Sequence, residues 1–335
     1  MPSHICCVVV GYGSAYNWGH RHAEWVEQTE GLSLHGICDT DAEARKRAAE
    51  AFGGRLRIFS HLDQVLEDDA VEMVALVTPH DTHAPLAIKA LRAGRHVLTE
   101  KVMCLNTAEA DAMIRAARES GKALSVFHNR RWDSDFLTVK KAIDSGILGD
   151  IFLIESCVTN YEKPFGWRAE KKHGGGQLYD WGAHLFDHAV QLIDAKPVTV
   201  FAELQTRVWD VDVDTFAKVV VRFDNGCLFE ADFGNVQQIS KPRWHVFGEK
   251  GTLVKRTFDP EEKASVKTSL HDIATTLRIE SVPGDWTVPY KNFSNHVNKG
   301  ADLIVKPENV RKSIAIIETA FKSAESGRSL SIGSS

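Results

Sequence analysis

The sequence has no Cys-x-x-Cys pair, and its six cysteines are scattered over 335 residues. Disulfide frameworks and structural zinc sites need regularly spaced cysteines, so the pattern predicts neither. Several of the cysteines fall in apolar runs, where a thiol behaves as a small hydrophobic side chain. This usage indicates a reducing compartment, and we expect a cytoplasmic protein.

The sequence also has no block of like charge. Its 40 basic and 45 acidic residues are interspersed and give a formal net charge of −5, which leaves no electrostatic footprint for nucleic acid. No apolar run is long enough to cross a bilayer, and the first residues do not resemble a signal peptide. We therefore expect neither a nucleic-acid partner nor a membrane partner. What is present is 43% hydrophobic residues, enough for two ordinary domains.

The first half of the sequence alternates short apolar runs with amphipathic stretches. Such alternation predicts βαβ units and a parallel sheet. Asp41 is expected to cap the helix after the second strand, and a capping box, Asn106-x-x-Glu109, marks the start of another expected helix. The expected strands are Ile5–Val10, Leu32–Cys38, Val71–Val77, His96–Thr99 and Ala123–Phe127.

A glycine turn directly follows the first expected strand. Gly11 and Gly13 stand there, with Ser14 next to them, and Asp39 ends the second strand. Glycines at this place let the backbone approach a pyrophosphate, and the acidic residue accepts hydrogen bonds from a ribose. Gly19 is the best candidate for the third glycine of the motif. The pattern predicts a dinucleotide site, and because Asp39 would repel a 2′-phosphate we expect NAD rather than NADP.

Three glycines precede an Asp–His pair in the second half. Gly174–Gly176 is followed by Asp180 and His184, which lie four residues apart and share a face if the segment is helical. A carboxylate beside an imidazole fixes its tautomer and raises its basicity, as a general base requires. The alternative is a pair of side chains on a solvated helix face. Adding His188 to this pair suggests metal ligands, but we expect no metal.

The remainder of the second half consists mainly of long strand-like runs. One pair is joined by the hairpin turn Asp224-Asn225-Gly226. Long strands with few covering helices leave one sheet face open, and such a face commonly meets a second copy. We therefore expect a homodimer or homotetramer formed through the open sheet face.

Several motifs, in order along nearly the whole chain, resemble the family of glucose–fructose oxidoreductase and inositol dehydrogenase (Gfo/Idh/MocA). Each resembles a stretch of that family: T-P-N-x-x-H, E-K-P, G-G-G-x-x-x-D-x-G-x-H, and the last helix with its tail. In this chain the first three are Thr78–His83, Leu98–Val102 and Gly174–His184. The last helix and its tail correspond to Val305–Glu308 and Ala324–Arg328.

The resemblance implies the fold and the catalytic residues. The implied fold is an α/β Rossmann domain, residues 1–128, followed by an α+β domain with a large, mostly antiparallel open-faced sheet, residues 129–335. It also implies a catalytic lysine, aspartate and histidine, which are Lys101, Asp180 and His184 here. A histidine can take a hydroxyl proton, an aspartate can stabilise the imidazolium, and a lysine can stabilise the developing oxyanion.

The same resemblance supplies further cofactor-binding candidates, with two departures from the family. His80 replaces the usual asparagine of the first motif, and Val102 replaces the proline of the second. The second departure leaves open whether the Lys101–Val102 bond is cis. The candidates implied in these two motifs are Thr78, Pro79, His80, His83, Glu100 and Lys101.

Substrate-binding candidates come from position and chemistry. His128 ends a strand at the edge of the sheet where ligands bind, and Arg130 lies in a segment that resembles the family's hinge. Trp167 and Arg168 suit a polyhydroxylated ring, although a packed loop with a salt bridge is an equal alternative. Together with Arg131, these arginines would favour an acidic or phosphorylated substrate if they point into the cleft.

These observations predict an NAD(P)-dependent oxidoreductase that acts on a secondary hydroxyl or ketone of a sugar, inositol or sugar derivative. Two alternatives remain. One is an NAD-dependent glycoside-cleaving enzyme of the same family. The other is a non-catalytic, nucleotide-binding regulatory protein.

Overall fold

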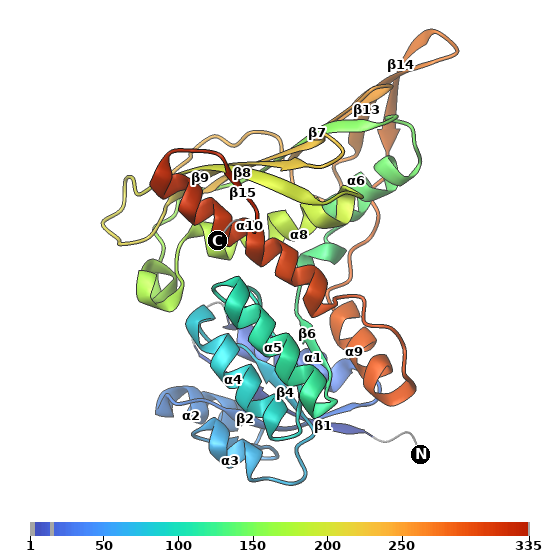
Figure 1. Ribbon diagram of the computed structural model, residues 1–335. Helices are drawn as coiled ribbons and strands as arrows, with labels where there is room; N and C mark the ends of the chain where they lie inside the picture. The colour runs from blue at the N-terminus through green and yellow to red at the C-terminus, as the bar shows by residue number, and fades with distance from the viewer. Residues whose placement is uncertain (1–3, 14–16, 334–335) are drawn as a thin grey trace. The chain divides into compact units, whose positions relative to one another are not determined.

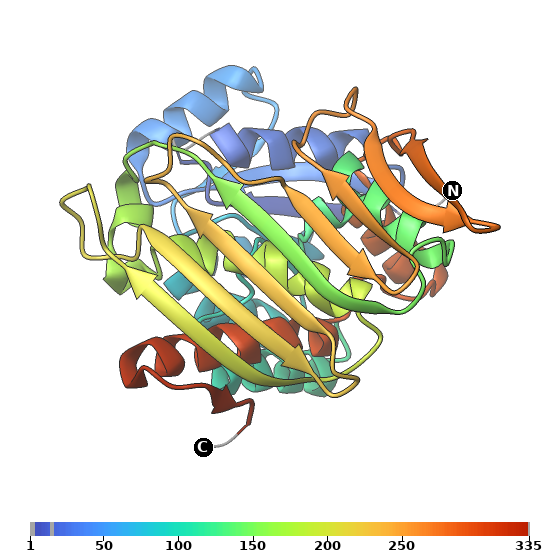
Figure 2. The same cartoon turned by 90° about the horizontal axis from the view of Figure 1, so that it is seen from above.

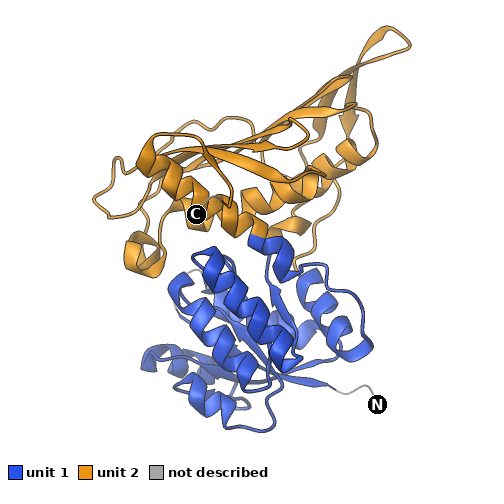
Figure 3. Cartoon of the chain, viewed as in Figure 1, with its two compact units in different colours: residues 1–128, 287–311 blue, residues 129–286, 312–335 orange. Residues whose placement is uncertain are grey.

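The computed structural model describes residues 4–13 and 17–333. The chain divides into two compact units (Figure 3). Unit 1 holds residues 1–128 and 287–311, and unit 2 holds residues 129–286 and 312–335. The segment 287–311 thus folds with the N-terminal half, a grouping that the sequence did not indicate. In the part of the chain that is described, no helix is long and apolar enough to cross a membrane.

Unit 1 is built on a six-stranded sheet in which every strand is parallel to its neighbours, in the order β3-β2-β1-β4-β5-β6. This order confirms the predicted Rossmann domain, and its turning point lies between β1 and β4, where such sheets bind ligands. The short strand β3 was not predicted. The strands are β1 (Ile5–Val10), β2 (Leu32–Cys38), β3 (Arg57–Phe59), β4 (Met73–Leu76), β5 (His96–Thr99) and β6 (Leu124–Val126).

Six α-helices accompany this sheet in the described part of unit 1. Two of them begin where the sequence places a cap: Asp41 accepts the Glu43 N–H (3.0 Å), and Asn106 accepts the Glu109 N–H (2.9 Å). Helices α4 and α5 lie side by side along the sheet (Figure 1). The helices are α1 (Trp18–Gln28), α2 (Ala42–Ala51), α3 (Leu62–Leu66), α4 (His80–Arg92), α5 (Thr107–Ser120) and α9 (Val288–Lys299).

Helix α9 joins unit 1 through an aromatic core. Tyr290 and Phe293 are fully buried in the apolar cluster that also holds Val26 and Phe127. Its ring contacts include Phe127 with Tyr290, whose centroids are 5.5 Å apart. Burying two large aromatic side chains is worth several kcal/mol, on the order of 2 kcal/mol each, and this explains why α9 folds with the N-terminal half.

Unit 2 contains a nine-stranded sheet in the order β14-β13-β12-β11-β7-β10-β9-β8-β15. All pairs are antiparallel except β10 with β7, so the predicted mostly antiparallel sheet is confirmed. The strands are β7 (Ile151–Thr159), β8 (Pro197–Gln205), β9 (Phe216–Phe223), β10 (Leu228–Gly234), β11 (Trp244–Gly248), β12 (Gly251–Lys255), β13 (Ala264–Leu270), β14 (Ile273–Ile279) and β15 (Leu330–Ser331).

The helices of unit 2 lie on one face of its sheet, and Figure 2 views the sheet from the other face. Side chains alternate accordingly: Val200 and Ala202 on β8 are buried, whereas Phe201 and Glu203 are exposed. The predicted hairpin turn is present, with Gly226 at φ 87°. The helices are α6 (Ser134–Asp144), α7 (Gln177–Asp180), α8 (Gly182–Leu192) and α10 (Pro307–Ser326), whose first turn is assigned to unit 1.

Candidate cofactor and catalytic sites

The glycine turn after β1 has the geometry of a nucleotide cradle. Gly11 has φ 98°, and a Cβ atom there would lie 2.2 Å from the Val77 carbonyl oxygen, so only glycine fits. Gly19 packs equally closely, since its Cβ would lie 2.4 Å from the Gly11 oxygen; this supports its place as the third glycine. Among the described residues, no atom outside its chain neighbours lies within 4 Å of the Gly13 Cβ position. Ser14 lies outside the described residues.

Asp39 is fixed at the end of β2. Its Oδ2 accepts the Tyr12 N–H at 2.6 Å, and its Oδ1 accepts the Asp41 N–H at 2.8 Å. The first contact ties the carboxylate directly to the glycine turn. A charged carboxylate beside the turn, with further acceptor capacity on both oxygens, fits the ribose hydroxyls of a dinucleotide. These residues therefore suit the cofactor that the motif predicts.

The loop after β4 packs against the same turn. A Cβ on Gly11 would lie 3.0 Å from Thr78 Cγ2, and Pro79 precedes the first residue of α4, His80. His83 is completely buried, with Nε2 2.9 Å from the Thr78 oxygen and Nδ1 2.7 Å from the Val102 oxygen. Burial lowers the pKa of His83, and its hydrogen bonds to the Val102 and Thr78 carbonyls act in the opposite direction. The side chain thus bridges two loops inside unit 1.

The turn after β5 carries Lys101. The Lys101–Val102 peptide bond is cis although Val102 replaces a proline, which answers the question that the sequence left open. The Lys101 N–H donates to Glu100 Oε2 at 2.9 Å, and Glu100 Oε1 lies 2.9 Å from His22 Nε2. Burial raises the pKa of Glu100, but the His22 hydrogen bond, the charge of Lys101 and the Lys101 N–H outweigh it and leave a lowered pKa. Glu100 is therefore a carboxylate at neutral pH.

Two residues that the sequence analysis did not select complete this network. His22 is buried in α1, and its Nδ1 lies 2.7 Å from the Tyr290 hydroxyl of α9. A polar residue on the buried face of α1, one turn after Gly19, is the signal that could have pointed to His22. Nothing local marks Tyr290, which is 268 positions away.

In unit 2, Asp180 ends α7 and His184 lies in the first turn of α8. Hydrogen bonds continue across the join: the Trp181 N–H donates to Gln177, and the His184 N–H donates to Trp181. The two residues therefore stand on successive turns of a nearly continuous helical path. His184 is buried at 4% exposure, with its ring 5.8 Å from that of Trp181. Asp180 Oδ2 lies 3.6 Å from Arg168 Nε.

Each of the three glycines before Asp180 has its own structural reason. Gly174 has φ 68°, and a Cβ on Gly175 would lie 2.5 Å from the Arg168 carbonyl oxygen. Gly176 has φ 102°, and its Cβ would lie 2.2 Å from Asp214 Oδ1. Asp214 in turn accepts the Leu178 N–H at 2.8 Å. These contacts, rather than open space for a ligand, account for the glycine run.

The arginines differ in their surroundings. Arg131 is buried and forms a two-pronged pair with Asp187, with both distances 2.7 Å, so it does not reach a substrate as the sequence analysis considered. Arg130 donates to Asp133 at 2.7 Å and stacks on Trp181 at 4.4 Å from the ring centre. Burial raises the pKa of Asp133, opposed by the charge of Arg130.

The other substrate candidates have these positions. Arg168 lies over the Trp167 ring at 4.3 Å and pairs with Asp180, while both keep partial exposure. His128 is buried at 1% exposure and is the second residue after the end of β6. His188 is stacked on Phe136 at 4.2 Å and its Nε2 faces the Arg130 oxygen at 3.0 Å. Its role is therefore packing, and the described residues contain no cluster of ligands for a metal ion.

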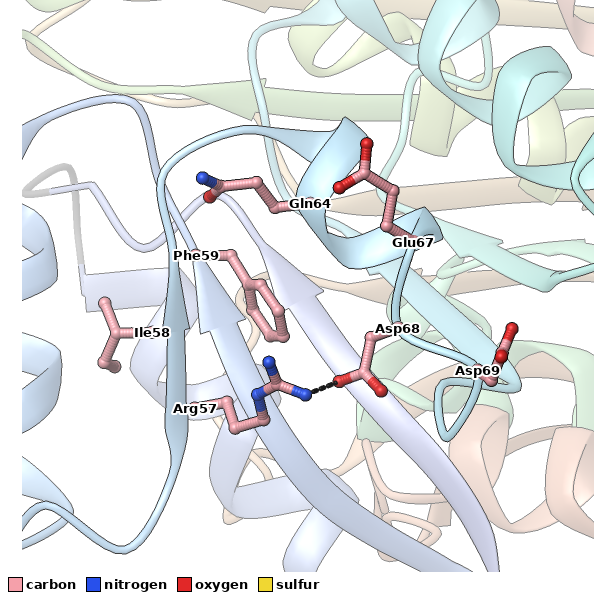
Figure 4. Close-up of a pocket in the computed structure, with 7 residues that line it drawn as sticks. All are labelled: Arg57, Ile58, Phe59, Gln64, Glu67, Asp68 and Asp69. Carbon is pink, nitrogen blue, oxygen red and sulfur yellow. Dashed lines mark hydrogen bonds and ion pairs between the residues drawn. The ribbon is translucent and has the colours of Figure 1, made fainter.

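Unit 1 has a hollow at the β3 edge of its sheet. None of the residues that line it was predicted as a site residue. Arg57 and Asp68 pair across it (Figure 4). His35 also contacts Asp68 at 2.8 Å, and the hydrogen bond from His35 lowers the pKa of that carboxyl. The lining residues are Arg57, Ile58, Phe59, Gln64, Glu67, Asp68 and Asp69. The charged groups at its centre already satisfy one another.

Both halves of the chain match known protein families. Residues 5–128 match the oxidoreductase family with an NAD-binding Rossmann fold, and residues 136–254 match the GFO/IDH/MocA C-terminal domain. The chain belongs to the Gfo/Idh/MocA oxidoreductase family. The predicted resemblance is thereby confirmed, and unit 1 is the NAD-binding Rossmann domain of such an oxidoreductase.

Members of the Gfo/Idh/MocA family resemble this chain over most of its length. A crystal structure of an NAD-binding protein from Listeria innocua is 30% identical, covers 98% of this chain and 99% of its own, and has a TM-score of 0.91. The scyllo-inositol 2-dehydrogenase (NADP(+)) IolW of Bacillus subtilis is 30% identical over 82% of each chain. An inositol 2-dehydrogenase of Rhizobium meliloti is 25% identical and covers 94% of this chain and 96% of its own.

Proposed function

We propose that this chain is an NAD-dependent dehydrogenase that transfers a hydride between nicotinamide and a secondary hydroxyl or ketone of a sugar, inositol or sugar derivative. The observation that carries the proposal is the glycine turn of β1 with the Asp39 carboxylate anchored to it, in a chain of this oxidoreductase family. Relatives named as inositol dehydrogenases support the substrate class. Because all six cysteines are free thiols, we also propose a cytoplasmic location.

In the proposed reaction, three side chains move or hold charge. Bound nicotinamide supplies the hydride acceptor. His184 takes the hydroxyl proton, Asp180 stabilises the resulting imidazolium, and Lys101 stabilises the oxygen as negative charge develops on it. The Arg168 guanidinium lies beside this carboxylate, with Nε 3.6 Å from Asp180 Oδ2. Trp167 and Arg168 offer a flat face and a guanidinium to a polyhydroxylated ring.

The preference for NAD over NADP rests on Asp39. A carboxylate at this place repels a 2′-phosphate and accepts hydrogen bonds from ribose hydroxyls. Titration of NADH and NADPH against tryptophan fluorescence tests this directly. We expect NADH to bind more tightly than NADPH. We expect Asp39→Asn to reduce this difference in affinity, because the substitution removes the charge while keeping an acceptor for the Tyr12 N–H. Tighter NADPH binding by the wild type would contradict the assignment.

The catalytic proposal is tested by turnover with a panel of polyols and glycosides, followed by NADH absorbance. We expect Lys101→Met and His184→Ala each to lower kcat by about 10²–10⁴-fold, the range for losing an acid–base or charge-stabilising group, with NADH affinity kept in His184→Ala. Unchanged turnover in both variants would overturn the mechanism. Cleaved glycoside without net NADH would favour the glycoside-cleaving alternative, and NADH binding without any turnover would favour a regulatory protein.

A further inference from the structure

A chain of hydrogen bonds runs through unit 1 from α9 to the turn that carries Lys101. The Tyr290 hydroxyl lies 2.7 Å from His22 Nδ1, and His22 Nε2 lies 2.9 Å from Glu100 Oε1. The other oxygen of the same carboxylate accepts the Lys101 N–H at 2.9 Å. Helix α9, helix α1 and the turn after β5 are thus linked by a series of hydrogen bonds that ends at the Lys101 backbone N–H.

The direction of each hydrogen bond follows from the groups involved. Burial raises the pKa of Tyr290 well above its usual value, so the phenol keeps its proton and can donate it to His22 Nδ1. When the phenol donates to Nδ1, a neutral ring carries its own proton on Nε2 and donates it to the Glu100 carboxylate. The phenol therefore selects the histidine tautomer that the carboxylate requires.

The side chains of this hydrogen-bond series are buried, and burial restricts their movement. Tyr290 and His22 are 0% and 1% exposed, and the His22 ring packs 4.5 Å from Phe127 and 5.1 Å from Trp25. Rings confined on several sides cannot swing away from Glu100. Hydrogen bonds to a charged group are also stronger than neutral ones, so the carboxylate is held in one orientation.

We propose that Tyr290 and His22 are positioning residues, which act through Glu100 to fix the backbone at Lys101 and so the point from which its side chain extends. This inference rests on the proposed function, because it takes Lys101 as the residue that stabilises the reacting oxygen. A second consequence is electrostatic: the Glu100 carboxylate helps Lys101 to keep its proton, as the charge of Lys101 in turn favours the ionised form of Glu100.

The test uses the full-length protein and variants that change few atoms. Tyr290→Phe removes only the hydroxyl, and Glu100→Gln removes only the charge. Ser294→Ala is the matched control, because Ser294 also lies on α9 and its hydroxyl donates to the Glu30 oxygen at 2.7 Å, outside this chain of hydrogen bonds. We expect Tyr290→Phe to lower kcat by about 3- to 10-fold, the factor for one net hydrogen bond, with KM nearly unchanged and Ser294→Ala close to wild type.

Two measurements do not depend on turnover. The ¹⁵N shifts of His22 report its tautomer, which should be uniform in the wild type and mixed in Tyr290→Phe. The ¹³C signal of methylated Lys101, assigned with Lys101→Arg, reports its amine pKa, which should fall in Glu100→Gln and stay constant in Ser294→Ala. If the wild type turns over no substrate, the proposed function fails while these signals still judge the positioning role. That role is overturned if Tyr290→Phe and Glu100→Gln match Ser294→Ala in every measurement made.

Discussion

Two glycines of the β1 turn have different surroundings at the scale of single atoms. Gly11 combines φ 98° with a Cβ position 2.2 Å from a backbone oxygen, whereas no residue in the described part of the chain approaches the Cβ position of Gly13 within 4 Å. The first glycine is required by the fold, whereas none of the described neighbours requires the second. Substitutions at the two positions should therefore separate stability from cofactor binding.

We expect Gly11→Ala to lower the free energy of unfolding by more than about 1–3 kcal/mol, because backbone strain adds to a clash with Val77 that has no flexible side chain to yield. Gly13→Ala should leave unfolding nearly unchanged and weaken NADH binding at least several-fold. Thermal unfolding and NADH titration measure the two effects. Unchanged NADH affinity in Gly13→Ala would show that the cofactor does not use this side of the turn.

Asp214 has an unusual protonation equilibrium that stability measurements can detect. Burial raises its pKa to about 6, although the Leu178 and Gln177 N–H groups act in the opposite direction. The folded state then binds more protons than the unfolded state between about pH 4 and 6, so this residue makes stability fall as pH rises through that window. Asp214→Asn keeps an acceptor for the Leu178 N–H but cannot titrate.

We therefore expect the difference in melting temperature between Asp214→Asn and the wild type to shift in favour of the variant from pH 4 to pH 7. Scans across this range in matched buffers give the measurement. Asp224→Asn is a suitable control, since this carboxylate lies in an exposed hairpin turn. A constant difference across the range would mean that Asp214 is ionised throughout.

At the scale of whole elements, α9 is held to unit 1 by few but large contacts. Phe293 is fully buried, and Lys299 at the other end of the same helix is exposed. We expect Phe293→Ala to destabilise unit 1 by about 3–5 kcal/mol, the range for emptying an aromatic site in a core, and Lys299→Ala to have almost no effect. Hydrogen exchange across residues 287–311 would show the loss; equal exchange in both variants would argue against this anchoring.

The sequence predicts those features of helices and turns that depend on neighbouring residues, and it does not predict contacts between distant segments. The caps Asp41 and Asn106 and the turn glycine Gly226 act within a few residues, so the sequence predicted them and the structure confirms them. The contact of His22 with Tyr290 depends on the packing of α9, which no local pattern encodes. The same is true of Gly176, whose neighbour Asp214 is 38 positions away by numbering.

The candidate site shows the same division. Gly11 and Asp39 belong to a motif whose spacing reflects one fixed turn, and the Asp39 carboxylate accepts the N–H of Tyr12, the residue after Gly11. The surroundings of the arginines were not predictable, because only tertiary packing pairs Arg131 with Asp187. The sequence alone does not distinguish an arginine in a buried ion pair from an arginine that binds a substrate.

At the scale of the whole molecule, the uncovered face of the nine-stranded sheet predicts self-association. Cross-strand pairing aligns Phe201 with Val220 and Glu203 with Lys218 on this face, and Lys218 contacts Glu230 and Asp232, both at 3.2 Å. A broad surface of alternating apolar and charged side chains suits a symmetric contact between two copies. We propose a homodimer or homotetramer formed there.

We expect light scattering to give a mass of two or four chains, and Phe201→Asp to reduce it by placing a charge at 40% exposure on that face. Ile239→Asp is a control, because Ile239 is 90% exposed in a loop outside the strands. A monomeric wild type would contradict the proposal. So would an unchanged mass in Phe201→Asp together with an altered mass in Ile239→Asp.

Because unit 1 consists of two separate segments of the chain, its core cannot be completed until the second segment has been synthesised. Residues 129–286, which are 158 residues, leave the ribosome between the strands of the Rossmann sheet and the helix that completes its core. At about 5–20 residues per second, this delay is roughly 8–30 s. During that time the apolar surface around Val26 and Phe127 is not yet covered by Tyr290 and Phe293, so the core of unit 1 stays incomplete until the last part of translation.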